Sequence, residues 1–457
     1  HAMARTALRP ALVGMVAWIT LSVFQFGYGI SELNAIETQF TCHDASGCLG
    51  FSENAFGLIT TMFTVGGALA SLGCGSAARY AHLGRKASLQ ASTAFSFLGS
   101  ALLGSGTSLT LLSTGRFLQG IGAGIGVVQV PLYLQEIAPP SLAGEIGILN
   151  QVAVVTGIFA AQAFGTLAAA HPASWRSVPQ ISAVIALGQL VIGALWACES
   201  PGWLEGEGAH VTTAAHAPSP ADLRARLWGR EAYETLPVTT EPAGGPTPPA
   251  HGWRTDPDFR RGMWIVALTQ MAQQFSGVNA ILYYSTGILS QLMPSLARIV
   301  GLLITVVNGV MTFPPIVLIS EKRVGRKALL VGSAAGMGFF CLLLAYSLWN
   351  AYALGSAIAI LCVIACFSMG LGPVPFVILP EVIPAAYVSL GSSFGLGVNW
   401  ASNIVVAASF PPLRKALGAL DGHTGGLVFL LFGVANLVFA ACIARDYRYE
   451  GDRWIMN

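Results

Sequence analysis

Long apolar stretches alternate with short polar ones along the whole chain. Stretches of about twenty residues with few charges are long enough to cross a bilayer as helices. They form two sets of six, at residues 11–33, 55–78, 87–107, 110–134, 146–170 and 178–198 and at residues 262–291, 297–320, 328–349, 353–379, 386–410 and 425–444. Residues 199–261 between the sets are rich in Pro, Gly and charged residues, which is typical of a linker. The pattern predicts an all-α membrane protein with two six-helix bundles, residues 1–198 and 262–457, joined by the linker 199–261, in which only residues 221–233 have a helical pattern.

Composition and charge agree with a membrane location. Of the 457 residues, 54% are hydrophobic and 10% charged, whereas a soluble domain carries about a quarter charged residues. The net charge of +2 gives no basic bias that would indicate a nucleic acid partner. Arg and Lys residues concentrate in both termini, the linker and the loops on the same side, so the positive-inside rule predicts that these segments are cytosolic.

One of the predicted spans carries polar side chains that lipid would not accept. Residues 273–287 include Gln274, Asn279 and Tyr283, which fall roughly along one face of a helix. Polar groups at membrane depth are costly unless they are paired, so this face is expected to point into the protein or a water-filled cavity, where it binds a polar solute. The alternative is that these amides join helices to one another.

Two short motifs occur in both halves of the chain. Residues 83–86 (Leu-Gly-Arg-Lys) recur as residues 324–327 (Val-Gly-Arg-Lys), and residues 131–136 are echoed by residues 375–381. The matching offsets indicate a duplicated six-span unit, and such parallel repeats are typical of transporters that rock two bundles around a site at the middle of the membrane.

Two cysteines flank a short polar loop on the non-cytosolic side. Cys42 and Cys48 are expected to form a disulfide there, because that side permits oxidation. Metal binding by these thiols with His43 and Asp44 is the alternative, which we do not favour because no tetrahedral ligand spacing stands out. No metal or cofactor is predicted.

Several motifs resemble the sugar porter family of the major facilitator superfamily, which includes facilitative glucose transporters, fungal hexose transporters and proton-coupled sugar symporters. The motifs are residues 273–279 (Gln-Gln-Phe-Ser-Gly-Val-Asn) with Tyr283 and Tyr284, residues 115–117 (Gly-Arg-Phe), 199–201 (Glu-Ser-Pro), 372–375 (Gly-Pro-Val-Pro) and 399–400 (Asn-Trp). The resemblance implies the major facilitator fold, with twelve transmembrane helices in two bundles.

The resemblance also implies a set of sugar-binding residues. An amide offers donors and acceptors to vicinal hydroxyls without a net charge to desolvate. The implied amides are Gln162, Gln273, Gln274, Asn279, Asn308 and Asn399, the aromatic platform is Phe367, Phe376 and Trp400, and the outer gate is Tyr283 and Tyr284. For the aromatic residues, ordinary helix packing is the alternative reading, most of all for Phe376, where glucose carriers commonly have Trp.

A proton-accepting carboxylate of the first span is missing at its usual place. Proton-driven relatives have Asp where this chain has Gly29, facing the buried Arg that matches Arg116. Glu32 follows nearly one helical turn later and reaches Arg116 if the register allows. The alternative is that Glu32 is solvated at the outer mouth.

A cytosolic charge network is also implied, but with fewer members than in relatives. Ala81, Ala143, Gly202 and Val388 stand where relatives carry polar or charged partners, so we predict a sugar-free state that is more inward-open than theirs. The retained members are Arg85, Lys86, Glu136, Glu199, Arg326, Lys327 and Glu381.

The sequence therefore predicts a carrier that moves a monosaccharide, a hexose such as glucose, by alternating access and without proton coupling. Two alternatives remain: a proton-coupled sugar or polyol symporter that uses Glu32 and Arg116, and a transporter-like sugar sensor. No catalytic group arrangement indicates an enzyme. The predicted partners are the sugar and the lipid bilayer, for a monomer in the plasma membrane or in a vacuolar or other internal membrane.

Overall fold

The computed structural model is almost entirely helical. It describes residues 9–41, 49–80, 83–139, 142–168, 172–205, 219–229, 255–290, 292–320, 324–384, 387–420, 425–450 and 453–454. The first half contains α1 (Pro10–Ser31), η1 (Asn34–Ile36), α2 (Glu37–Thr41), α3 (Glu53–Tyr80), α4 (Arg85–Ser105), α5 (Leu109–Ile137), α6 (Ala143–Ala168), η2 (Pro172–Arg176) and α7 (Ser177–Leu195). Two short helices follow, α8 (Pro201–Glu205) and α9 (Pro220–Trp228).

The second half contains α11 (Pro257–Phe275), α12 (Val278–Ser290), α13 (Ala297–Met311), α14 (Phe313–Ser320), α15 (Arg326–Trp349), α16 (Ala353–Met369), α17 (Val374–Val382), α18 (Val388–Gly418) and α19 (Leu427–Asp446). A small antiparallel pair, β1 (Tyr449–Glu450) and β2 (Arg453–Trp454), follows. Helices therefore occupy each of the twelve predicted apolar stretches.

Within the described residues, nine helical segments are long and apolar enough to span a membrane. The predicted stretches that do not meet this measure are those of α4, α11 with α12, and α18. All three carry many Ser, Gln or Asn side chains. In the broken pair α11–α12 and in α18, these polar side chains are the ones that build the site described below.

Close helix packing in the first half depends on glycine. A Cβ on Gly27 of α1 would lie 2.0 Å from the carbonyl oxygen of Val154 in α6. A Cβ on Gly157 of α6 would likewise lie 2.0 Å from the carbonyl oxygen of Phe24 in α1. The two helices thus touch backbone to backbone, as small residues allow in membrane bundles.

In the second half, three of the predicted spans are broken helices. α11 ends at Phe275, and Gly277 has a φ of 86° before α12 begins. Pro314 and Pro315 follow the break between α13 and α14, and Gly370 to Pro373 separate α16 from α17. Broken helices expose backbone polar groups inside a bundle, a feature of transporters near their solute site.

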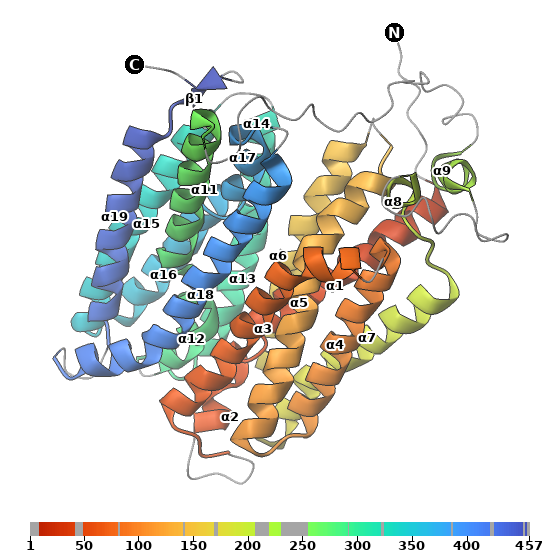
Figure 1. Cartoon of the computed structure of the whole chain (residues 1–457). Coiled ribbons are helices and arrows are strands. Elements are labelled where there is room, and N and C mark those ends of the chain that lie inside the picture. The colour runs from red at the N-terminus through yellow and green to blue at the C-terminus, as the bar shows by residue number, and fades with distance from the viewer. Residues whose placement is uncertain are drawn as a thin grey trace.

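The two halves contact each other mainly at one end. We call the end at which α1 begins and α19 ends the terminal end, and the other the opposite end. α3 packs against α18, α6 against α13, and α12 against η1 and α2, and Figure 1 shows α3 and α18 meeting in the lower part of the view. α8 and α9 lie at the terminal end beside α1 and α5 (Figure 1).

α9 is a small amphipathic helix within the predicted linker. Its Leu223 packs with Trp203 and Leu204 of α8, and the indole of Trp228 donates to the carbonyl of Ile137 at the end of α5 (2.8 Å). The helix begins at Pro220, one residue before the predicted start, and ends at Trp228 because Gly229 has a φ of 96°.

Candidate functional site

A buried cluster of amides lies in the second half between α11 and α18. Gln270, Gln273 and Gln274 share one face of α11 because residues three and four apart are neighbours on a helix. Asn399 of α18 reaches all three: its Nδ2 donates to Gln270 (2.7 Å) and Gln273 (2.6 Å), and its Oδ1 accepts from Gln274 (3.0 Å). Three of the predicted sugar-binding amides, Gln273, Gln274 and Asn399, are therefore in direct contact.

The cluster continues across the break after α11. Asn279 of α12 donates to Oε1 of Gln274, which also accepts from Asn403 of α18 (3.0 Å). Tyr283 follows Asn279 by one turn of α12 and is buried. The predicted face formed by Gln274, Asn279 and Tyr283 thus points into the protein.

Gln270 and Asn403 belong to this cluster although neither lies in a motif shared with the sugar porters. Asn403 lies one turn after Asn399, and Gln270 lies one turn before Gln274, so helical spacing from the chosen amides was the signal that would have found both. Nε2 of Gln270 and Oδ1 of Asn403 have no hydrogen-bond partner among the described residues. They are a buried donor and a buried acceptor on facing helices.

The break between α16 and α17 supports the cluster. Nε2 of Gln273 donates to the carbonyls of Leu371 and Gly372, at 2.8 Å each. Phe367 is half-buried at the same break, where its carbonyl accepts from the backbone N–H of Gly372 (2.8 Å). The unwound backbone therefore fixes the orientation of Gln273.

Two predicted amides lie away from the cluster. Gln162 of α6 accepts hydrogen bonds from Ser31 (3.2 Å) and Asn34 (3.0 Å). Asn308 of α13 accepts from the hydroxyl of Ser368 in α16 (2.8 Å), within the second half. The structure thus places these two residues in separate hydrogen-bond networks.

Asn34 links the halves at the opposite end. In addition to its bond to Gln162, its Nδ2 donates to the hydroxyl of Ser285 in α12 (3.2 Å). Its Oδ1 accepts from the backbone N–H of Thr286 (3.2 Å). The Asn34 side chain of the first half therefore bonds both to Gln162, a predicted sugar-binding residue, and to α12.

The predicted aromatic residues differ in their surroundings. Trp400 is buried against Phe26 of α1, with ring centroids 6.0 Å apart, and its indole N–H has no partner among the described residues. Phe376 is 43% exposed on α17.

The predicted gate tyrosines close the opposite end. Tyr284 stacks on Phe410 of α18 (4.9 Å) and meets Phe56 of α3 edge-on (6.0 Å). Tyr283 and Tyr284 are both buried. Because α3 belongs to the first half and α18 to the second, this aromatic group holds the halves together.

Glu32 and Arg116 form a buried ion pair. Nη1 of Arg116 lies 3.1 Å from Oε2 of Glu32, and the two side chains are 1% and 0% exposed. Gln119 bonds to both, while the carbonyl of Gly29 accepts from Nη2 of Arg116 (2.9 Å). The carboxylate is therefore buried, and its solvation at an outer mouth is excluded in this state. Oε1 of Glu32 has no partner among the described residues.

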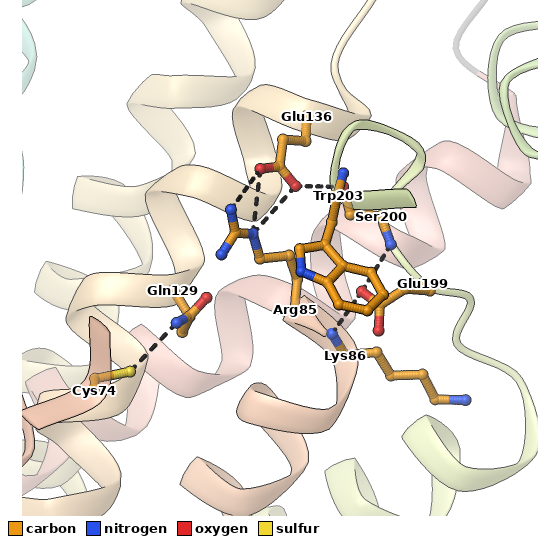
Figure 2. Close-up of polar contacts among 8 residues, drawn as sticks. All are labelled: Cys74, Arg85, Lys86, Gln129, Glu136, Glu199, Ser200 and Trp203. Carbon is orange, nitrogen blue, oxygen red and sulfur yellow. Dashed lines mark hydrogen bonds and ion pairs between the residues drawn. The ribbon is translucent and has the colours of Figure 1, made fainter. Parts of the chain in front are cut away.

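The first-half part of the predicted charge network is assembled at the terminal end (Figure 2). Arg85 at the start of α4 pairs with Glu136 of α5 (3.1 Å), and that carboxylate also accepts from the hydroxyl of Ser200. Glu199 accepts from the backbone N–H groups of Lys86 (3.0 Å) and Ser200 (2.9 Å). Burial raises the pKa of the Glu199 carboxyl, and these hydrogen bonds oppose that shift.

The second-half part of the network is smaller. Arg326 of α15 pairs with Glu381 of α17 (2.5 Å), whereas Lys327 makes no ion pair with a described residue. The Arg85–Glu136 and Arg326–Glu381 pairs thus each join helices of the same half. Gly202 packs on Glu136, since a Cβ there would lie 2.9 Å from Cγ of that residue.

Cys42 and Cys48 lie outside the described residues, so their disulfide stays a prediction. The same holds for His43 and Asp44 of the alternative metal site. Among the described residues, no group of three or more His, Cys, Asp or Glu side chains is placed to hold a metal ion.

The fold is that of the major facilitator class. The structure superposes on the inward open conformation of the xylose transporter XylE from E. coli with a TM-score of 0.72, at 20% identity and with 95% of this chain and 96% of that chain covered. Identity at this level supports the fold alone.

The family follows from the sequence comparisons. The model of the family described as "Sugar (and other) transporter" matches residues 14–447. A probable metabolite transport protein of Saccharomyces cerevisiae is 30% identical, over 93% of this chain and 89% of its own length. The facilitated glucose transporter member 4 of Mus musculus is 32% identical, over 95% and 87%. The chain belongs to the sugar transporter family, and it is a transporter rather than an enzyme.

Proposed function

We propose that this protein carries a hexose such as glucose by facilitative alternating access. The observation that carries the proposal is the amide cluster of α11, α12 and α18, which offers uncharged donors and acceptors to sugar hydroxyls. The glucose transporters among its relatives support a hexose as the solute. Each hydrogen bond contributes about 0.5–1.5 kcal/mol net, so we expect weak binding that allows the sugar to leave.

The two halves, residues 1–198 and 262–457, are the proposed moving bodies. Their contacts at the opposite end would break as that end opens, while the amide cluster stays with the second half. From the Arg and Lys residues near the terminal end, we infer that the termini and the linker face the cytosol. We propose a monomer in the plasma membrane or in a vacuolar or other internal membrane.

Uptake of labelled sugars by proteoliposomes tests this function. Glucose is expected to equilibrate across the membrane at the same rate with and without a pH gradient, while protein-free liposomes take up little. Absence of glucose flux in folded protein, with flux of another solute, would overturn the assignment of a hexose.

The Glu32–Arg116 pair favours a second candidate, proton-coupled symport. A carboxylate buried beside one arginine is a site at which a proton can be taken up and released during the cycle. For this candidate, an inward proton gradient accumulates sugar above equilibrium, and Glu32→Gln abolishes accumulation but leaves sugar exchange intact. If the proton gradient does not drive sugar accumulation in the unsubstituted protein, proton coupling is excluded and facilitative transport is supported.

A further inference from the structure

The helix break that separates the amides of α11 from the gate tyrosines has a hydrogen-bond partner on α19. Within the described residues, α19 has the highest mean hydropathy of the candidate spans, 2.6, yet Asn436 lies near its middle. This side chain is 0% exposed. An amide in such surroundings is costly unless it is hydrogen-bonded.

Asn436 is bonded to the break itself. Its Nδ2 donates to the carbonyl of Ser276 (3.0 Å) and to the carbonyl of Phe432 one turn earlier in α19 (2.9 Å). Ser276 is the first residue after α11, and it is also fully buried. The bond therefore joins α19 to a carbonyl at the point where α11 stops.

The neighbouring contacts fix the same point. The hydroxyl of Ser276 donates to the carbonyl of Gln273 (2.7 Å) and accepts from the backbone N–H of Val278 (3.3 Å). A Cβ on Gly277 would lie 2.8 Å from the ring of Phe432. α19 thus covers Gly277 with Phe432 and holds Ser276 with Asn436, two residues four apart on one helix face.

The order of residues along the chain shows which groups lie on each side of the break. The amides of α11 precede Ser276, whereas Asn279 and the gate tyrosines follow Gly277. A bond to the Ser276 carbonyl fixes the end of α11. A rotation of α12 relative to α11 then occurs through the backbone torsions of Gly277. Gly277 suits that role, since its φ of 86° is open to glycine at little cost.

We infer that Asn436 is a positioning residue for transport: it fixes the pivot on which α12, with the gate, moves relative to the sugar-binding amides of α11 and α18. The inference rests on the proposed transport function. Without this bond, the Ser276 carbonyl keeps only the weak contact from the thiol of Cys341 in α15 (3.9 Å), and the bend is no longer confined to Gly277. The rate of gate movement then falls, while the bonds between the amides of α11 and α18 hold these side chains in place.

The test compares Asn436→Leu with Val438→Leu, a substitution at a lipid-exposed position of the same helix. Glucose affinity is measured on purified protein, and glucose uptake is expressed per binding-competent molecule. We expect Asn436→Leu to lower turnover up to about tenfold, which corresponds to about 1.4 kcal/mol, with the Kd unchanged within about twofold. Val438→Leu should change neither quantity.

Unchanged turnover per binding-competent molecule overturns the inference, and so does a loss of affinity equal to the loss of turnover. A lower yield of folded protein does not change turnover per binding-competent molecule. If the yield is the only quantity that falls, Asn436 has a structural role only. If Asn436→Leu folds poorly, Asn436→Thr replaces it, because a threonine hydroxyl still donates to a carbonyl one turn back but is too short to reach Ser276. Absence of glucose flux in the unsubstituted protein would instead contradict the proposed function.

Discussion

Six amide side chains of the second half, Gln270, Gln273, Gln274, Asn279, Asn399 and Asn403, bond mainly to one another. A sugar that enters exchanges some of these amide–amide bonds for amide–hydroxyl bonds. The net gain per bond is therefore small, and discrimination depends on which hydroxyl leaves an amide unpaired.

Gln274→Ala and Asn403→Ala are each expected to weaken glucose binding by about 1–3 kcal/mol, because a buried partner is left unsatisfied. That equals about a five- to 150-fold rise in Kd, measured by equilibrium binding to purified protein. Asn350→Ala, which removes an exposed amide at the end of α15, is the control. Normal binding by both cluster variants would place the sugar elsewhere.

The sequence located the cluster because amides in an apolar run are conspicuous and share a helical face. The sequence grouped Gln162 and Asn308 with that cluster. A resemblance places a residue on a helix, but it does not show which partners that residue has in a given conformational state. In the present state Gln162 bonds to Asn34, which also holds α12. Glu32 pairs with Arg116 although Gly29 stands at the usual position of the carboxylate. The sequence does not show how far each side chain reaches in the folded bundle, so it left a solvated Glu32 as an alternative.

At the level of helices, packing between α1 and α6 depends on the missing side chains of Gly27 and Gly157. Sequence patterning predicted where helices lie but treated each broken span as continuous. The breaks coincide with Gly277, with Pro314 and Pro315, and with Gly370 to Pro373. Hydropathy does not encode such local signals, nor the tertiary bonds that Gln273 makes to the α16–α17 break.

Gly27→Ala should therefore destabilise the protein by about 1–3 kcal/mol, the usual cost of overpacking, and lower the thermal unfolding midpoint in detergent. Gly147→Ala in the same α6 is the matched control, since a Cβ there meets no atom within 4 Å. Equal midpoints for the two variants would contradict the backbone-to-backbone contact.

On the scale of the whole molecule, the described polar bridges between the halves lie at the opposite end, whereas the ion pairs described at the terminal end stay within one half. Exposed pairs are worth about 0–1 kcal/mol each, so a few missing inter-half pairs shift the balance of states by a comparable amount. The prediction that this chain rests more inward-open than its relatives stays open to test.

Introducing Ala143→Arg and Val388→Arg together is expected to favour opening of the opposite end. Pro411→Cys, at a buried position where α18 meets Gly57 of α3, reports that opening through labelling by a membrane-impermeant maleimide. Labelling should rise about five- to 150-fold for a shift of about 1–3 kcal/mol. Protein without Pro411→Cys gives the background, and unchanged labelling in a double variant that still transports would show that these positions do not set the resting state.

The buried pair of Glu32 and Arg116 also has an electrical consequence. With the carboxylate ionised, the two charges cancel inside the membrane, so a moving half carries no net charge through the field at this site. With the carboxylate protonated, Arg116 leaves one positive charge, and a membrane potential acts on it with up to about 2.3 kcal/mol per 100 mV. If Glu32 stays ionised throughout the cycle, sugar flux is therefore expected not to depend on the membrane potential. If Glu32 is protonated during the cycle, sugar flux is expected to rise with an inside-negative potential.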